Sequence, residues 1–172
     1  MASGGDLNND GHDDILVGAP GAFGGKGRVY VYCGMTSDLL FTVEGDAIGD
    51  RFGASVAVIG DVTGDGVADF IVGAPHYSGA AEHGGRVYVY SGATGDLLLT
   101  VTGQEAHGRF GAAVTGGRFE RPPDARPLHT IGPKWRIVVG VDPALGGAER
   151  KELLFRFDLP FNPGAMQDAR PS

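Results

Sequence analysis

The chain has 172 residues and carries 21 acidic against 14 basic residues, a formal net charge of −7. This balance argues against a nucleic-acid partner, because such proteins present basic patches to phosphates. The single cysteine, Cys33, excludes an internal disulfide and is expected to be a small core residue within a strand. No stretch approaches the ~20 apolar residues of a membrane span, and residues 1–14 lack the basic start and apolar run of an export signal.

The first feature along the chain is an aspartate-rich loop at residues 6–14. Oxygen-bearing side chains stand at loop positions one, three, five and nine, and Gly11 at position six allows the sharp bend that turns them inward. Ca²⁺ is a hard cation that takes six to eight oxygen ligands. The segment therefore predicts a calcium site made by the side chains of Asp6, Asn8, Asp10 and Asp14 and the carbonyl of His12.

Short apolar segments separated by turn residues follow this loop. Ile15–Val17, Arg28–Tyr32 and Leu39–Val43 are rich in β-branched and aromatic residues and predict strands. The glycine-rich stretch 21–27 is a near miss for a phosphate-binding loop, because Gly27 stands where Ser or Thr is needed and a strand follows. We interpret it as a β-turn.

The loop returns 55 positions later and predicts a second calcium site, made by the side chains of Asp61, Thr63, Asp65 and Asp69 and the carbonyl of Val67. A solvated turn would explain the glycine, but it does not require acidic residues at matched positions twice. An EF-hand or a dockerin-type loop takes its last ligand at position twelve and leads into a helix. Position twelve is Val17 or Val72 here, within a predicted strand.

The strands recur with the loops. Arg28–Tyr32 returns as Arg86–Tyr90, and Leu39–Val43 as Leu97–Val101, which gives a unit of four strands about 55 to 58 residues long. The fold class is therefore all-β, a partial β-propeller of four-stranded antiparallel blades with calcium-binding hairpin loops.

The segment from Phe52-Gly53 to Gly73-Ala74-Pro75, with the calcium loop between, resembles the FG-GAP repeat of integrin α-subunit β-propellers and their bacterial relatives. The resemblance covers about residues 5–115. It implies a seven-bladed propeller with Ca²⁺ in the hairpin between the first two strands of a blade, held by the eight side chains named above. Thr63 is a weaker ligand than the usual Asp or Asn, so the second site is expected to bind less tightly.

Four segments are expected: an incomplete blade at 1–44 that lacks its inner strand, a complete blade at 45–102, a degenerate third blade at 103–159 and a disordered tail at 160–172. The third repeat has a proline-rich run, Arg118–Pro127, in place of the metal loop, and strands are expected to resume at Trp135–Gly140 and Glu152–Phe157. A propeller needs at least four blades. The chain is therefore expected to be part of a longer protein, an assembling subunit or marginally folded.

No catalytic motif accompanies the scattered histidines, so no enzyme activity is expected. The resemblance implies a calcium-binding segment of an adhesion or protein-recognition protein, extracellular or periplasmic, whose partners are the remaining blades, a second copy or an extracellular protein ligand. Two alternatives stay open: an accessory propeller of a calcium-dependent, phospholipase-like hydrolase, and a structural spacer. For hydrolysis, Asp13 and Glu44 are the nearest candidate bases.

Overall fold

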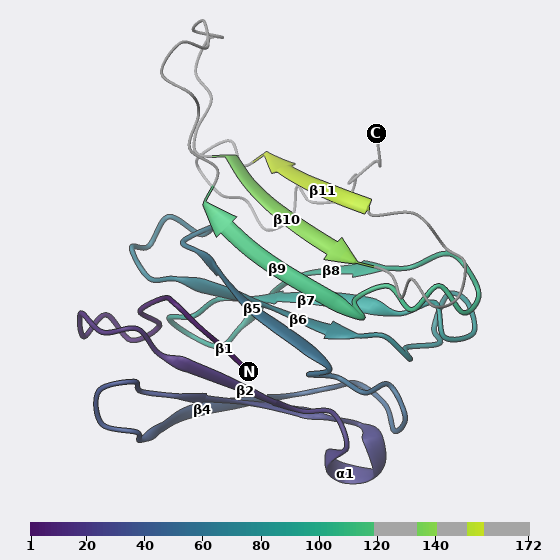
Figure 1. Ribbon diagram of the computed structural model, residues 1–172, viewed down its shortest axis with the longest axis horizontal. Helices are drawn as coiled ribbons and strands as arrows, with labels where there is room; N and C mark the ends of the chain where they lie inside the picture. Colours follow the sequence, from purple (N-terminus) through teal and green to yellow (C-terminus); the bar gives the residue numbers. More distant parts are fainter. Residues whose placement is uncertain (119–133, 141–150, 157–172) are drawn as a thin grey trace, which may run out of the picture.

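The computed structural model describes residues 1–118, 134–140 and 151–156. Its elements, apart from one short helix, are strands (Figure 1). In chain order they are β1 (Ala2–Ser3), β2 (Ile15–Ala19), α1 (Ala22–Gly25), β3 (Arg28–Tyr32), β4 (Leu39–Glu44), β5 (Ser55–Gly60), β6 (Asp69–Ala74), β7 (Arg86–Tyr90), β8 (Leu97–Thr102), β9 (Ala113–Arg118), β10 (Lys134–Gly140) and β11 (Lys151–Arg156). Among these residues, no helix is long and apolar enough to cross a membrane.

The first sheet has four antiparallel strands in the order β1-β2-β3-β4. The sequence predicted that this blade lacks its inner strand, and that expectation is wrong. Residues Ala2 and Ser3 pair with Leu16 and Ile15 and form a two-residue inner strand. A strand this short needs no Phe-Gly segment, because backbone hydrogen bonds to β2 suffice to define it.

The predicted β-turn after β2 is a single helical turn, α1, with an irregular backbone. Phe23 has φ 53° and Gly24 φ 70°, so left-handed residues interrupt the turn and return the chain toward β3. The amides of Gly25 and Gly27 donate to the carbonyls of Gly21 and Ala22. The glycines of this stretch thus serve a tight connection between strands rather than a phosphate site.

The second sheet repeats the first with full-length strands in the order β5-β6-β7-β8. Matching registers underline the repeat, since Val17 lies opposite Tyr30 in the first sheet and Val72 opposite Tyr88 in the second. Both sheets shift register at the same place between their third and fourth strands, after Val31 and after Val89. The all-β, four-stranded antiparallel architecture of a partial β-propeller is therefore confirmed.

A third sheet follows in the order β11-β10-β9. The strands predicted at Trp135–Gly140 and Glu152–Phe157 are present as β10 and β11, and each observed end lies within one residue of the predicted end. The proline-rich run that is expected to replace the metal loop lies, after Arg118, outside the described residues, and so does the tail at 160–172. The blade boundaries drawn from the sequence remain predictions.

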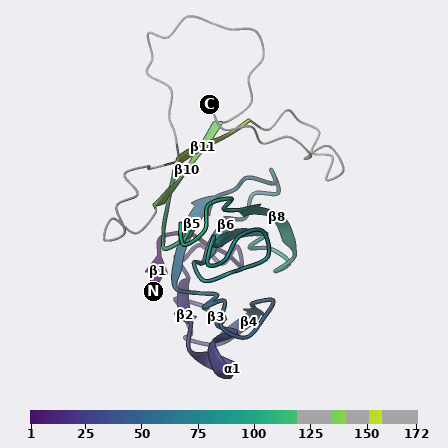
Figure 2. The same cartoon turned by 90° about the vertical axis from the view of Figure 1, so that its right-hand side faces the viewer.

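The sheets are stacked, with the inner strands β1, β5 and β9 side by side (Figures 1 and 2). An apolar cluster fills the space between the first two sheets. The first sheet contributes Leu16, Val29 and Val31, and the second contributes Phe70, Val72, Tyr88 and Tyr90. Phe52 is fully buried and packs edge-on against Tyr88, with ring centroids 5.1 Å apart. This aromatic packing joins one blade to the next.

The opposite face of the second sheet meets β9. Ile71, Val87 and Val89 are buried there, and Val114 packs against their cluster. Each blade thus has one face for the blade before it and one for the blade after it. The face of the first sheet that corresponds to Phe70, Val72, Tyr88 and Tyr90 carries Ile15, Val17, Tyr30 and Tyr32, which are only half-buried in this chain.

A polar contact accompanies the apolar packing. Asp46, in the connection from the first sheet to the second, accepts a hydrogen bond from the Tyr88 hydroxyl at 2.7 Å and pairs with Arg86 at 3.2 Å. Burial and the Asp46 carboxylate raise the pKa of Tyr88, which stays protonated and donates. The connection therefore orients the blade that it leads into.

We expect the change Phe52→Ala to lower the free energy of unfolding by about 3–5 kcal/mol, because it opens a cavity between two blades. The exposed Ile48, which leaves 78% of its surface in solvent, provides the control. Ile48→Ala should change stability by less than about 0.5 kcal/mol. Urea unfolding followed by circular dichroism measures both. Equal effects of the two substitutions would contradict the packing described here.

Candidate metal-binding loops

The two candidate loops occupy equivalent positions. Residues 6–14 connect β1 to β2, and residues 61–68 connect β5 to β6, so both lie at the same end of the stack, on the left in Figure 1. They are in direct contact, because the Ala68 amide donates to the Asp6 carbonyl at 3.0 Å. Adjacent blades therefore place their loops side by side.

The first aspartate of each loop organises the backbone. Asp6 accepts hydrogen bonds from the amides of Asp10 at 3.1 Å and Gly11 at 2.8 Å, and Asp61 accepts from Gly64 at 2.6 Å and Gly66 at 2.9 Å. Gly11 and Gly66 have φ of 87° and 88°, a left-handed conformation that favours glycine. The predicted bend at loop position six is therefore present in both copies.

The aspartates in the middle of the two loops also correspond. Asp10 accepts the His12 amide and Asp65 accepts the Val67 amide, each at 2.9 Å, and both aspartates are exposed. At position three, the Asn8 side chain donates to Asp10 at 2.9 Å, whereas the Thr63 hydroxyl contacts Asp61 at 3.3 Å. The backbone at His12 and Val67, whose carbonyls are the predicted metal ligands, thus takes part in the same turn. The side-chain contacts at position three differ between the loops.

The last aspartate of each loop is completely buried. Asp14 accepts the Leu7 amide at 2.8 Å through one oxygen and the Gly34 amide at 3.0 Å through the other. Asp69 repeats the arrangement with the amides of Val62 at 2.7 Å and Gly92 at 3.0 Å. A Cβ on either glycine would meet backbone carbonyl oxygen, of Asp13 or of Ala68. These carboxylates therefore tie the loop to the neighbouring hairpin, a role that the ligand pattern did not predict.

Burial has an electrostatic consequence at the second loop. It raises the pKa of the Asp69 carboxyl to about 6, although the amides of Gly92 and Val62 act in the opposite direction. Asp65 nearby adds like-charge repulsion. The ionised loop is therefore under electrostatic stress, which a bound cation would relieve.

The first loop contains a further group that the sequence reasoning assigned to the core. Cys33 is buried just after β3 rather than within it, and its Sγ lies 3.1 Å from an Asp10 oxygen. Among the described residues, Asp10, Asp14 and Cys33 are the group of three whose ligating atoms lie within 4.8 Å of one another. Alignment of the two repeats could have placed Cys33 outside the strand, because Cys33-Gly34 matches Ser91-Gly92 directly after the same strand.

The donor sets fit a hard divalent cation. Each loop offers three carboxylates and one neutral side-chain oxygen on a tightly bent backbone, and two of these carboxylates are already half-buried or buried. Asp10 and Asp14 lie together beside Cys33, while Asp6 and Asn8 contact Asp10 through the loop hydrogen bonds. Ca²⁺ prefers such oxygens, whereas the sulfur of Cys33 is a ligand for softer metals.

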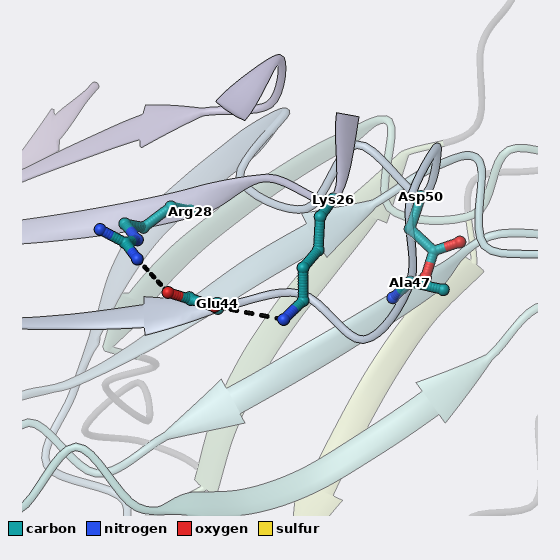
Figure 3. A network of polar contacts seen from close by, with 5 residues as sticks. All are labelled: Lys26, Arg28, Glu44, Ala47 and Asp50. Atoms are coloured by element: carbon teal, nitrogen blue, oxygen red, sulfur yellow. Dashed lines mark hydrogen bonds and ion pairs between the residues drawn. The ribbon is translucent and has the colours of Figure 1, made fainter. Parts of the chain in front are cut away.

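Glu44 does not belong to this site, so the expectation that it is a nearby candidate base is wrong. It ends β4 at the opposite end of the sheet, where it pairs with Arg28 and with Lys26 (Figure 3). These cations hold the pKa of the Glu44 carboxyl below its usual value, which makes it a poor base. Asp50, drawn next to Ala47 on the far side of Lys26, accepts the Ala47 amide at 3.1 Å and shapes the connection to β5.

A loop, a strand that ends in Gly-Ala before a proline, and a following hairpin occur twice, and together they define a repeat of the β-propeller class. The family model of the FG-GAP repeat matches residues 2–32 and 52–90, which include both loops. The chain therefore carries FG-GAP repeats, and the resemblance drawn from the sequence is confirmed.

Similar proteins are long and contain the aligned region as a small part. The chain is 42% identical over 94 residues to integrin alpha-4 of Xenopus laevis, which covers 51% of the chain and 9% of that protein. It is 41% identical over 101 residues to integrin alpha-3 of Mus musculus (54% and 9%). It is also 40% identical over 130 residues to phosphatidylinositol-glycan-specific phospholipase D of Rattus norvegicus (63% and 15%).

We predict that Asp69→Ala lowers stability even without metal, by about 3 kcal/mol, because the buried amides of Val62 and Gly92 lose their acceptor. The exposed Asp65 is the matched control. Asp65→Ala should change the metal-free stability by no more than about 0.5 kcal/mol. Urea unfolding in EGTA measures both variants. Comparable losses would mean that Asp69 has no structural role beyond that of an exposed loop carboxylate.

Proposed function

We propose that the chain is a non-catalytic, calcium-binding FG-GAP propeller segment of an extracellular protein that acts in adhesion or protein recognition. The observation that carries the proposal is the pair of loops with equivalent backbone hydrogen bonds and equivalent carboxylates. Turn formation alone does not require three acidic side chains in each loop. Their mutual repulsion is offset when a cation binds.

The two calcium ions would be held by side chains of Asp6, Asn8, Asp10 and Asp14 with the His12 carbonyl, and of Asp61, Thr63, Asp65 and Asp69 with the Val67 carbonyl. The ion supplies positive charge that neutralises the clustered carboxylates. The protein supplies the rest: the glycine bend, and the buried aspartate that ties the loop to the next hairpin. We propose weaker binding at the second loop, where Thr63 replaces Asn8.

Two considerations support an extracellular or periplasmic setting. Loops of this type suit millimolar calcium, which occurs outside the cell. The integrin alpha relatives share about 40% identity with half of the chain. A role in adhesion or recognition follows from the same relationship. The ligand would be another extracellular protein that contacts loops at one rim of the completed propeller.

A second candidate function has support of its own. The match to phosphatidylinositol-glycan-specific phospholipase D extends over 130 residues and 63% of the chain, more than the integrin alpha-4 match. The chain would then be an accessory propeller of a calcium-dependent, phospholipase-like hydrolase. In this reading, as in that of a structural spacer, catalysis belongs to another part of the protein. Glu44 cannot act as a base at either loop, because it lies at the opposite end of the sheet and pairs with Lys26 and Arg28.

The remaining blades are the proposed structural partners. The half-buried face of the first sheet, with Ile15, Val17, Tyr30 and Tyr32, matches the face that the second sheet buries against the first. We propose that a preceding blade covers it in a complete propeller. In its absence a second copy of the chain would cover the same face.

Calcium titration tests the metal assignment. We expect about two ions to bind per chain, with a dissociation constant near 10⁻⁴ M, typical of extracellular modules. At 1 mM Ca²⁺, each site would then add about 1.4 kcal/mol to the free energy of unfolding. Isothermal titration calorimetry gives the stoichiometry, and thermal unfolding with and without EGTA gives the stabilisation.

The variant Asp65→Ala separates the two sites. It removes one exposed carboxylate from the second loop and leaves Gly66 and the first loop unchanged, so the stoichiometry should fall to about one. Asp10→Ala should do the same for the first loop. Absence of binding at millimolar Ca²⁺ would refute the assignment, and loss of both sites in either variant would indicate unfolding instead.

We expect the isolated chain to self-associate through the half-buried face of the first sheet, because a partly exposed apolar patch favours a partner. Tyr32→Asp should shift the equilibrium toward monomer. EGTA should increase association, because it removes the calcium ions that are proposed to hold the loops. Asp38→Ala, on an exposed turn outside that face, is the control. Sedimentation velocity at micromolar concentration measures the shift. A compact monomer with no dye-accessible apolar surface would contradict this expectation.

A further inference from the structure

Three histidines gather at the end of the second blade opposite the loops. His76 follows β6, His83 lies in the hairpin before β7, and His107 lies in the connection from β8 to β9. The ring centroids of His76 and His83 are 4.9 Å apart, and those of His83 and His107 are 5.7 Å apart. The cluster draws together three separate segments of the chain, and none of the three side chains is fully buried.

The first blade shows that the fold does not need these histidines. Equivalent backbone bonds align the blades, since Arg51 N donates to Gly25 O at 2.8 Å and Arg109 N donates to His83 O at 3.0 Å. The counterparts of His76, His83 and His107 in the first blade are Gly21, Gly25 and Gly49. All three positions are therefore glycine where the cluster is absent.

Two of the histidines occupy backbone conformations that favour glycine. His83 has φ 47° and His107 φ 59°, and their counterparts Gly25 and Gly49 have φ 87° and 93°. A residue with a side chain pays a conformational cost in this region, and such strain is often found at functional sites. A Cβ on Gly25 would lie 3.4 Å from Gly49, so the backbone itself brings the two equivalent side chains together.

We propose that His76, His83 and His107 form a binding site for a divalent transition-metal ion such as Zn²⁺. Imidazole nitrogen is a preferred ligand of this class of metal. Zn–N bonds of ~2.0–2.1 Å with tetrahedral angles place the centroids of two coordinating imidazoles about 5 Å apart. The spacing of neighbouring rings in the cluster is close to this value.

The surrounding charges act in both directions. Burial, with help from Arg51, His83 and Arg109, lowers the pKa of His76 and keeps its imidazole neutral, the form that binds metal. The same arginines repel a dication. Glu82 offsets them, because its carboxylate lies 3.9 Å from Nε2 of His107 and can provide a fourth, anionic ligand.

Binding requires a small side-chain adjustment. The three imidazoles are neighbours, but their nitrogens do not all lie within 4.8 Å of one another, as the ligating atoms of Asp10, Asp14 and Cys33 do. The His107 side chain is 59% exposed and can change rotamer without disturbing the core. His76 and His83, whose rings are the closer pair, form the core of the proposed site, and His107 completes it.

The test uses the full, untagged chain with 1 mM Ca²⁺ present to load the aspartate loops, and Zn²⁺ as the titrant in calorimetry. We expect a stoichiometry of one zinc ion per chain. His83→Gly and His107→Gly, which restore the residues of the first blade, should each weaken zinc binding by more than about tenfold. Both variants should fold at least as stably as the parent, because glycine suits their backbone.

Two controls use residues of the other repeat. His12→Val removes a histidine outside the cluster, and Cys33→Ser removes the thiol of the first loop, with Val67 and Ser91 as the natural counterparts. Neither should alter the zinc affinity. The proposal is overturned if the wild-type chain shows no saturable zinc binding, if the double variant His83→Gly/His107→Gly retains it, or if Cys33→Ser abolishes it.

Discussion

The rest of the structure depends on one buried carboxylate per repeat. Asp14 and Asp69 have no exposed surface, and each accepts amide hydrogen bonds from the start of its own loop and from the following hairpin. Burying a carboxylate is costly unless its oxygens are satisfied. Two backbone segments must therefore converge on it, which sets where β2 and β6 begin and where the next hairpin turns. The exposed loop carboxylates Asp10 and Asp65 then extend from a backbone that is already placed.

This arrangement explains why the blades stack as they do. Once loop and hairpin are joined, Leu7 and Val62 are buried beside them, and the alternating residues of β2 and β3 present two apolar faces. Tyr88 and Tyr90 of the second blade fill the space over Leu16 and Val31 of the first. One face of each blade presents aromatic rings, and the other face presents branched aliphatic residues. Because the aromatic face of one blade packs on the aliphatic face of the blade before it, successive blades stack in the same orientation.

Much of this could be predicted from the sequence. Matched spacing of Asp6 and Asp61, and of the Arg-Val-Tyr-Val-Tyr strands, was sufficient for the strand order, the repeat and the loop bend. Contacts between segments distant in sequence were not accessible. Cys33 reaches Asp10 only because β3 ends beside the loop, and Glu44 is turned away from it by the antiparallel reversal of the chain. The two-residue strand β1 escaped prediction because a pairing this short has no sequence signature.

The two repeats of the chain resemble each other more at the loop end of the blades than at the opposite end. At the loop end, the repeats share the hydrogen bonds that the first and last aspartates accept. The first aspartate accepts the amide of the glycine at position six, and the last accepts amides from its own loop and from the following hairpin. At the opposite end, Gly25 and Gly49 correspond to His83 and His107, and the backbone hydrogen bonds persist although the side chains change. A repeat whose connections are held by main-chain bonds is free to alter its side chains there. Side chains at Gly25 and Gly49 can therefore differ from those at His83 and His107 while the backbone bonds of the connection are kept.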